Sequence, residues 1–349
     1  MFRILSIDGG GIRGIIPAKI LAMLEEELKR QNKSSHIYDY FDLICGTSTG
    51  GIIAIGLGLG MSASDILDLY LDNAASIFPK KRFLKKLCLI KRGKSFYERD
   101  CLKNLVKQSY DKAVGETPAR LGHSHTRLCI PAYDAYKGAM RVFKTSHHSD
   151  LIRDYQMPAV DVAMSTAAAP VFFDSYQYQY TPLNGNQPMS YSNLVDGGIM
   201  ANNPALIGYI EAVCSLNAKP EEIAILSLGT GNNLLSDFPK PLSAKYWLYE
   251  NKHLLRLIDL ISSAQDDYTI NLMKFLQRGI GPSGAQQFIY DRLQHPFCND
   301  EDISMDESAP DKLKHLENIG QELYGDHAAA LLKTYFQDVK QPFVPYSKL

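Results

Sequence analysis

The first half of the chain alternates between short apolar runs and stretches in which apolar residues recur at every fourth position. The run over residues 2–7 (FRILSI) predicts a buried strand. Four aliphatic side chains at helical spacing follow it, at Ile16, Ile20, Leu24 and Leu28. Because charged residues gather at the end of this segment, it predicts an amphipathic helix.

Five more apolar runs predict further strands, over residues 41–45, 128–133, 141–143, 193–195 and 223–228. A Gly/Ile/Leu-rich helical segment begins at Gly51, and apolar residues return at helical spacing over residues 312–336. Apolar strands that alternate with helices are typical of a largely parallel sheet with helices on both faces. The sequence therefore predicts the α/β class.

Two stretches differ from this pattern. Residues 79–95 are basic with apolar side chains interleaved, which is typical both of an amphipathic lid or insertion on an anionic bilayer and of an ordinary solvated helix. Residues 299–311 are acidic and predict a loop. We expect a catalytic α/β core over residues 1–235, with the basic stretch as an insertion. A mainly helical C-terminal part over residues 236–349 is expected to pack on this core.

Composition and charge narrow the class of protein. A formal net charge of -1 over 349 residues gives no sign of a nucleic acid polymer as partner. The six cysteines are scattered without paired spacing, which favours a reducing compartment. The most apolar run, residues 51–61, is shorter than the ~20 residues of a membrane span, and no signal peptide precedes the first predicted strand. We expect a cytoplasmic protein, with a translocated effector as the alternative.

A serine lies between two glycines where the second predicted strand turns into a helix. The segment reads Gly46-Thr47-Ser48-Thr49-Gly50. A serine on such a turn must adopt strained backbone angles that lift its hydroxyl above the sheet, and flanking glycines remove the Cβ clashes. Ser48 is therefore the candidate nucleophile. Cys45, within the apolar strand, is interpreted as a buried structural thiol.

A glycine-rich loop follows the first predicted strand, with the sequence Asp8-Gly9-Gly10-Gly11-Ile12-Arg13-Gly14. Its glycines match the G-x-G-x-x-G pattern of dinucleotide-binding folds. However, no second strand with an acidic end follows at the required distance, and Asp8 would repel a pyrophosphate. Consecutive glycines let the N–H groups of Gly10 and Gly11 converge on an oxyanion. We expect an oxyanion hole, where Arg13 adds charge or holds the loop; a tight turn without a ligand is the alternative.

A carboxylate follows the predicted strand over residues 193–195. It belongs to Asp196-Gly197-Gly198, whose glycines allow close approach to another loop. Taken alone, the pattern favours an aspartate that caps the next helix. The alternative is a base that accepts the proton of Ser48, for which a dry setting that raises the pKa above about 3.9 would help.

Histidines offer a rival to a Ser–Asp dyad. A triad in the chain order Ser–Asp–His would need a histidine after Asp196, and four are available, at His253, His295, His315 and His327. None follows a strand in a glycine-punctuated loop, so the dyad is preferred. Four earlier histidines lack companion cysteine or carboxylate spacing, so we expect no metal site and interpret them as parts of solvated loops: His123, His125, His147 and His148.

At these three motifs the chain resembles the patatin-like phospholipases. DGGGIRG, GTSTG and DGG occur in the family's order, and residues 164–170, 195–204 and 226–231 resemble further blocks of the family. The resemblance implies a three-layer α/β/α sandwich with a mostly parallel central sheet, and calcium-independent acyl-ester hydrolysis without a cofactor. It implies Ser48 as nucleophile, Asp196 as base, and an oxyanion hole from the Gly9–Gly11 loop with Arg13. The other motif glycines are Gly14, Gly46, Gly50, Gly197 and Gly198.

The expected function is a serine lipid acyl hydrolase of phospholipase A or lysophospholipase type. Its substrate would be a membrane phospholipid or another acyl lipid, reached from a peripheral position at the membrane. One alternative is a nucleotide-regulated antiviral or effector phospholipase with a small-molecule activator. Another is a catalytically silent lipid-binding module, against which the intact Ser48, Asp196 and glycine loop argue. The sequence predicts no oligomeric state.

Overall fold

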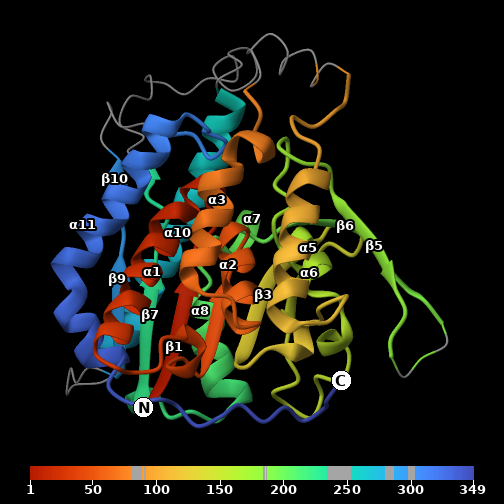
Figure 1. Ribbon diagram of the computed structural model, residues 1–349. Helices are drawn as coiled ribbons and strands as arrows, with labels where there is room; N and C mark the ends of the chain where they lie inside the picture. Colours follow the sequence, from red (N-terminus) through yellow and green to blue (C-terminus); the bar gives the residue numbers. More distant parts are fainter. Residues whose placement is uncertain are drawn as a thin grey trace.

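The computed structural model (Figure 1) describes residues 1–80, 89, 92–183, 185, 187–233, 253–279, 287–297 and 303–349. Most of the basic stretch at residues 79–95 and the start of the acidic stretch at residues 299–311 therefore lie outside the described residues. Within the described ranges, no helix combines the length and the hydropathy needed to cross a bilayer.

An eight-stranded sheet in the order β5-β6-β3-β2-β1-β7-β9, with β4 beside β3, organises the described chain. Its parallel strands are β1 (Phe2–Ile7), β2 (Leu43–Gly46), β3 (Arg127–Asp134), β7 (Ile223–Leu228) and β9 (Ile289–Leu293). The antiparallel strands are β4 (Ala139–Lys144), β5 (Tyr176–Tyr180) and β6 (Met189–Asp196). A separate parallel pair joins β8 (Asn232–Asn233) to β10 (Pro296–Phe297). Short connections join β3 to β4 and β5 to β6. Because parallel neighbours need a long crossover connection, strands joined in this way must pair antiparallel.

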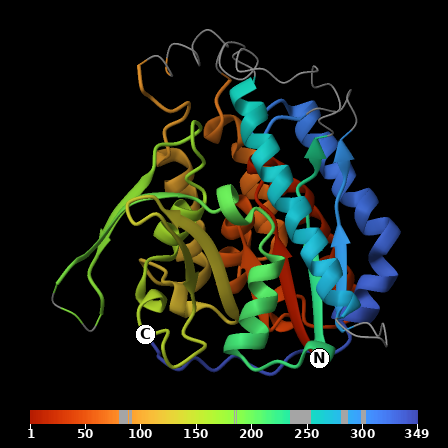
Figure 2. The same ribbon diagram turned by 180° about the vertical axis from the view of Figure 1, so that it is seen from behind.

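Helices cover both faces of this sheet. Those on the face in front in Figure 1 are α1 (Ile15–Arg30), α2 (Thr49–Gly58), α3 (Ala63–Ile77), α5 (Asp100–Val114), α6 (Ala159–Thr166) and α11 (Pro310–Tyr335). Figure 2 shows the opposite face, covered by α7 (Gly198–Ala201), α8 (Ala205–Ile210) and α10 (His253–Arg278), which is drawn in cyan. The predicted three-layer α/β/α architecture is confirmed.

Alternate side chains of β1 pack into two hydrophobic cores, one on each face of the sheet. Leu5 and Ile7 pack among the helices on the side of α1, whereas Ile4 packs with α8 and α10 on the other side. Successive side chains of a strand point to opposite faces, so an uninterrupted apolar run is what a strand covered on both faces requires. The apolar stripe predicted for α1 is fully buried on one of these faces.

The C-terminal part of the chain is joined to this fold at several places. β9 extends the main sheet beside β7, and α11 packs along α1. The hydroxyl of Tyr335 at the end of α11 donates to the carbonyl oxygen of Ile225 in β7 at 2.8 Å. The last residues cross the end of the sheet at which β1 begins (Figure 1), where the N–H of Tyr346 donates to the carbonyl oxygen of Ser146. The boundary predicted at residue 235 stays a prediction.

Candidate active site

Ser48 lies on a sharp turn between β2 and α2. Its backbone angles, φ 55° and ψ −123°, form a conformation that residues other than glycine rarely adopt. A Cβ atom at Gly46 would overlap the carbonyl group of Gly50, and one at Gly50 would overlap the carbonyl oxygen of Ile7. Both positions therefore require glycine, because any larger residue would clash with the neighbouring backbone. The turn places the Ser48 hydroxyl at the carboxyl end of the parallel strands, beside the N-terminus of α2.

The carboxylate of Asp196 faces this serine from the end of β6. Ser48 Oγ donates to Asp196 Oδ2 at 2.6 Å, and the N–H of Gly198 donates to Asp196 Oδ1 at 2.7 Å. One oxygen thus pairs with the first N–H of α7, while the other meets the serine hydroxyl. Burial raises the pKa of Asp196 to about 6, against the lowering effect of the two hydrogen bonds. The carboxylate is mostly ionised at neutral pH and is a stronger base than a carboxylate in water.

Thr166, at the end of α6, ties the serine turn to the aspartate loop. Its Oγ1 accepts a hydrogen bond from the N–H of Ser48 at 3.0 Å and donates to the carbonyl oxygen of Pro131 in β3 at 2.5 Å. Its carbonyl oxygen accepts the N–H of Gly197 at 3.3 Å. The sequence placed Thr166 in the small-residue block at 164–170 but indicated no role for it, because its contacts are all distant along the chain.

The three consecutive glycines of the loop differ in the partners of their backbone groups. The N–H of Gly9 is paired with the carbonyl oxygen of Asn202 at 3.1 Å, and the carbonyl oxygen of Gly9 accepts from Thr230 Oγ1 at 2.7 Å. Gly10 and Gly11 line the same pocket as Ser48, and their N–H groups donate to no other described residue. Gly11 has a φ of 58°, in the left-handed region. Gly9 therefore anchors the loop through both of its backbone polar groups.

Arg13 is buried and lies outside the set of residues that line this pocket. Its Nε is 3.5 Å from the carbonyl oxygen of Gly10, and its guanidinium carbon is 5.9 Å from the centre of the Phe297 ring. A Cβ atom at Gly14 would overlap the side chain of Thr49, so this last glycine of the motif allows the loop to pack on the start of α2. Arg13 therefore contacts the glycine loop from its buried side, away from the pocket.

The pocket beside Ser48 and Asp196 has a volume of about 190 Å³ and is strongly apolar. Aliphatic and aromatic side chains from α2, α3, α5 and the segment after α6 supply much of its wall, among them Ile52, Ile77, Phe78, Leu102, Phe172 and Phe173. Ile261 of α10 and Met305, from the described end of the acidic stretch, complete the wall. The sequence did not predict these C-terminal contributions, because neither residue lies in a recognisable motif.

Within the described chain, no histidine lines this pocket. His315 and His327 lie on α11, and His295 lies beside β10. The polar partners that the structure gives the Asp196 carboxylate are Ser48 and Gly198. The described residues therefore present the serine and the aspartate as a pair without a third member.

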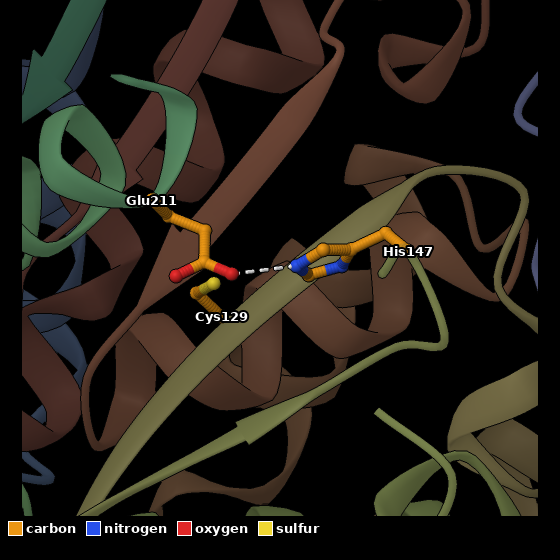
Figure 3. A group of neighbouring side chains, drawn as sticks. All are labelled: Cys129, His147 and Glu211. Atoms are coloured by element: carbon orange, nitrogen blue, oxygen red, sulfur yellow. Dashed lines mark hydrogen bonds and ion pairs between the residues drawn. The ribbon is translucent and has the colours of Figure 1, made fainter. Parts of the chain in front are cut away.

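One histidine interpreted as solvated is in fact buried. Figure 3 shows His147 beside Cys129 and Glu211, with ligand atoms that all lie within 4.8 Å of one another. His147 Nε2 is 2.9 Å from Glu211 Oε1, and Lys144 Nζ is 2.5 Å from Glu211 Oε2. Hydrogen bonds from both partners hold the pKa of Glu211 at about 2 despite its burial. The Lys144 ammonium already pairs with the charge of Glu211, so the described residues form a buried ion pair with His147 bonded to its other oxygen.

Comparison with known proteins decides the family. A family model described as patatin-like phospholipase matches residues 5–209, which is more than half of the chain and includes the serine turn, the glycine loop and Asp196. The chain belongs to the patatin-like phospholipase family. Membership identifies it as a lipid acyl hydrolase.

Full-length relatives come from bacteria and plants. The chain is 30% identical to a cGAMP-activated phospholipase of Escherichia coli, over 98% of this chain and 94% of that protein. It is 31% identical to patatin-like protein 2 of Arabidopsis thaliana, over 93% of this chain and 83% of that protein. Among solved structures, VipD from Legionella pneumophila aligns with 93% of this chain and 67% of that chain, at 14% identity and a TM-score of 0.39.

Proposed function

We propose that this patatin-like phospholipase cleaves fatty-acyl esters of membrane lipids through a dyad of Ser48 and Asp196. The observation that carries the proposal is the 2.6 Å contact between Ser48 Oγ and Asp196 Oδ2 at the wall of an apolar pocket. A serine, its base, two backbone donors that pair with no other described residue, and a place for an acyl chain are the parts that ester hydrolysis requires.

Acylation begins when Ser48 Oγ attacks the ester carbonyl carbon and Asp196 Oδ2 takes the hydroxyl proton. The carbonyl oxygen becomes an oxyanion, which accepts hydrogen bonds from the N–H groups of Gly10 and Gly11. Collapse of this intermediate breaks the ester bond, and the leaving lysolipid alkoxide takes the proton from Asp196. The product of this half-reaction is an acyl ester of Ser48.

Deacylation repeats the sequence with water as the nucleophile. Asp196 takes a proton from a water molecule while the oxygen of that water attacks the acyl carbonyl carbon. The second tetrahedral intermediate collapses, Ser48 Oγ recovers the proton from Asp196, and a free fatty acid leaves. No step needs a metal ion, so we expect turnover to be calcium-independent.

The apolar wall supports a lipid acyl chain as the bound part of the substrate. Ile52, Ile77 and Leu102 offer apolar surface to the pocket. The free energy falls when a hydrocarbon chain covers this surface and removes it from water. A substrate that sits in a bilayer must be reached at the bilayer surface, and we therefore propose peripheral contact with membranes.

The test is fatty-acid release from mixed phospholipid vesicles in the presence of a chelator. We expect release by the native protein and loss by at least about 100-fold in Ser48→Ala and Asp196→Asn, because each removes a member of the reacting pair. Ser149→Ala and Asp150→Asn make the same chemical changes at exposed positions and should retain full release. Comparable release by native protein and Ser48→Ala would reject the dyad.

A regulated form of this activity is a second candidate. The cGAMP-activated phospholipase of Escherichia coli aligns with nearly the whole chain, including the part beyond the family model. Binding of cGAMP would raise the melting temperature and increase fatty-acid release at saturating ligand. Activity that is full without a nucleotide and unchanged across a panel of cyclic dinucleotides would show a constitutive enzyme.

A further inference from the structure

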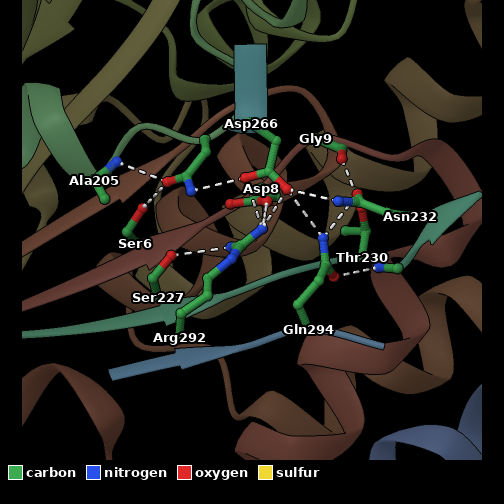
Figure 4. A network of polar contacts seen from close by, with 12 residues as sticks. Ser6, Asp8, Gly9, Ala205, Ser227, Thr230, Asn232, Asp266, Arg292 and Gln294 are labelled. Atoms are coloured by element: carbon green, nitrogen blue, oxygen red, sulfur yellow. Dashed lines mark hydrogen bonds and ion pairs between the residues drawn. The ribbon is translucent and has the colours of Figure 1, made fainter. Parts of the chain in front are cut away.

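Three charged side chains lie buried together beside the glycine loop (Figure 4). Asp8, which directly precedes the loop, accepts from Arg292 Nη2 at 2.5 Å. The same nitrogen contacts both carboxylate oxygens of Asp266, at 2.8 and 2.9 Å. Asp8 comes from the end of β1, Arg292 from β9 and Asp266 from α10, so the C-terminal third supplies two of the three charges.

Neutral side chains surround this triad and complete its hydrogen bonds. Asp266 also accepts from Asn203 Nδ2 at 2.9 Å, from Asn232 Nδ2 at 2.9 Å and from Gln294 Nε2 at 3.2 Å. Arg292 Nη1 donates to Ser227 Oγ at 3.0 Å. A buried carboxylate with four different donors has one favourable position, and it imposes that position on the donors.

The network holds the glycine loop on both sides of Gly9. Asn203 follows Asn202, whose carbonyl oxygen accepts the N–H of Gly9. Asn232 lies two residues after Thr230, whose hydroxyl donates to the carbonyl oxygen of Gly9. Asp8 is bonded to Gly9 along the chain. The peptide groups on either side of Gly9 are thus fixed by the triad and its neighbours.

A second contact from the C-terminal third holds the other end of the loop. The N–H of Ile12 donates to the carbonyl oxygen of Met305 at 2.9 Å, and a Cβ atom at Gly11 would overlap that carbonyl group. The amides of Gly10 and Gly11, which pair with no other described residue, therefore lie between two anchors. Asp266, Arg292 and Met305 all lie beyond residues 5–209, the part that the family model matches.

The charge balance shows why Arg292 matters most. Two carboxylates that face one another in a dry interior repel unless a cation lies between them. Burial raises the pKa of Asp8 to about 7, Arg292 lowers it, and the charge of Asp266 raises it. Without the guanidinium, the pKa of Asp8 would rise further, so that Asp8 would be protonated at neutral pH or would move away, and Gly9 would move with it.

The geometry points to Arg292 and Asp266 as positioning residues that aim the Gly10 and Gly11 amides at the reacting carbonyl oxygen. This inference rests on the proposed function, because it assigns these amides to the oxyanion. Neither side chain lines the pocket, so both act through the loop rather than on the substrate. The segment beyond the family core is, on this view, part of the catalytic apparatus.

The experiment compares Arg292→Lys and Asp266→Asn with Arg141→Lys in the full chain. Arg141 is a matched control, because its side chain is 12% exposed and pairs with Asp154 at 2.9 Å, while that of Arg292 is 10% exposed. Lysine keeps the charge but cannot reproduce the several contacts of a guanidinium. The readouts are kcat and KM for a soluble short-chain ester, the rate at which a fluorophosphonate labels Ser48, and the melting temperature.

We expect kcat and the labelling rate to fall by about 10- to 100-fold in Arg292→Lys and Asp266→Asn, since a misplaced donor costs that much. KM should change by less than about twofold, since the pocket wall is untouched. Arg141→Lys should lose melting temperature to a similar extent but keep its kcat. Equal loss of kcat in Arg141→Lys and Arg292→Lys would overturn the inference.

Hydrogen exchange separates failure of this inference from failure of the proposed function. The peptide that contains residues 8–14 should exchange faster in Arg292→Lys than in native protein, and at the native rate in Arg141→Lys. If Ser48→Ala retained activity, the proposed function would fail, whereas this exchange pattern would still show that the C-terminal third fixes the loop. Native exchange at residues 8–14 in Arg292→Lys would contradict the inference whatever the activity.

Discussion

At the scale of single residues, Asp196 contacts both the start of a helix and the proposed nucleophile. Its Oδ1 pairs with the first N–H of α7 and its Oδ2 with the Ser48 hydroxyl. Burial makes the ionised form costly, and the two donors compensate only in part, so the pKa settles at about 6. A carboxylate with a pKa of about 6 changes its charge within the pH range in which enzyme rates can be measured.

We expect kcat/KM for a soluble ester to rise with pH as Asp196 loses its proton near pH 6, and to level off above about pH 7. Only the ionised carboxylate can accept the serine proton, so below the pKa the rate should fall by about tenfold per pH unit. The measurement is kcat/KM from pH 4.5 to 8.5, corrected for unfolded protein. A flat profile, or a midpoint near 4, would mean that Asp196 is not the base that limits acylation.

At the scale of elements, the end of α6 joins the two loops that meet at the site. Thr166 contacts the Ser48 turn through its hydroxyl and the aspartate loop through its carbonyl oxygen. It also anchors α6 to β3 through Pro131. The distance between the proposed nucleophile and the proposed base therefore depends on a helix that contributes neither of them.

Thr166→Val should lower kcat by about tenfold, because the Ser48 N–H loses its acceptor and the turn shifts relative to Asp196. Loss of the buried hydroxyl should also cost about 1–3 kcal/mol of unfolding free energy. Thr126 is the matched control, since its equally buried hydroxyl donates to a backbone carbonyl oxygen, that of Phe41 just before β2. Thr126→Val should lose comparable stability in a denaturant titration but keep kcat, and equal kcat in both variants would contradict this role for Thr166.

At the scale of the whole molecule, the C-terminal third completes the sheet, the core and the glycine loop. β9 covers the outer edge of β7, and α11 buries an apolar face against α1. Apolar burial on this scale supplies much of the free energy that holds a domain folded. The same third contacts the glycine-loop segment through Arg292, which donates to Asp8, and through Met305, which accepts from Ile12.

A chain that ends at residue 235 should therefore show no cooperative thermal unfolding transition. It would expose the apolar face of α1 and leave β7 as an open sheet edge, which favours aggregation. A chain that ends at Pro345 loses only the last contacts of the tail and should unfold cooperatively, as followed by circular dichroism. A sharp transition in the shorter chain would show that residues 1–235 fold alone.

The parts that the sequence determined by itself are those with a local physical cause. Runs such as residues 2–7 and 223–228 predicted strands because a strand buried on both faces needs continuous apolar side chains. The glycines around Ser48 predicted the turn because the backbone there excludes a Cβ atom. The alternating segment YQYQY at Tyr176–Tyr180 also carries a strand signal, although it lies outside the predicted strands.

Tertiary structure alone decided which groups meet. Gly9 shares its motif with Gly10 and Gly11, yet only its N–H is taken by Asn202. His147 is buried by Glu211, 64 residues away along the chain, and Arg292 reaches Asp8 across 284 residues. Local sequence reflects backbone conformation and periodicity over a few positions. Pairings over such separations arise only when strands and helices pack, so no local motif predicts them, and they decide which amides of the glycine loop are paired within the protein.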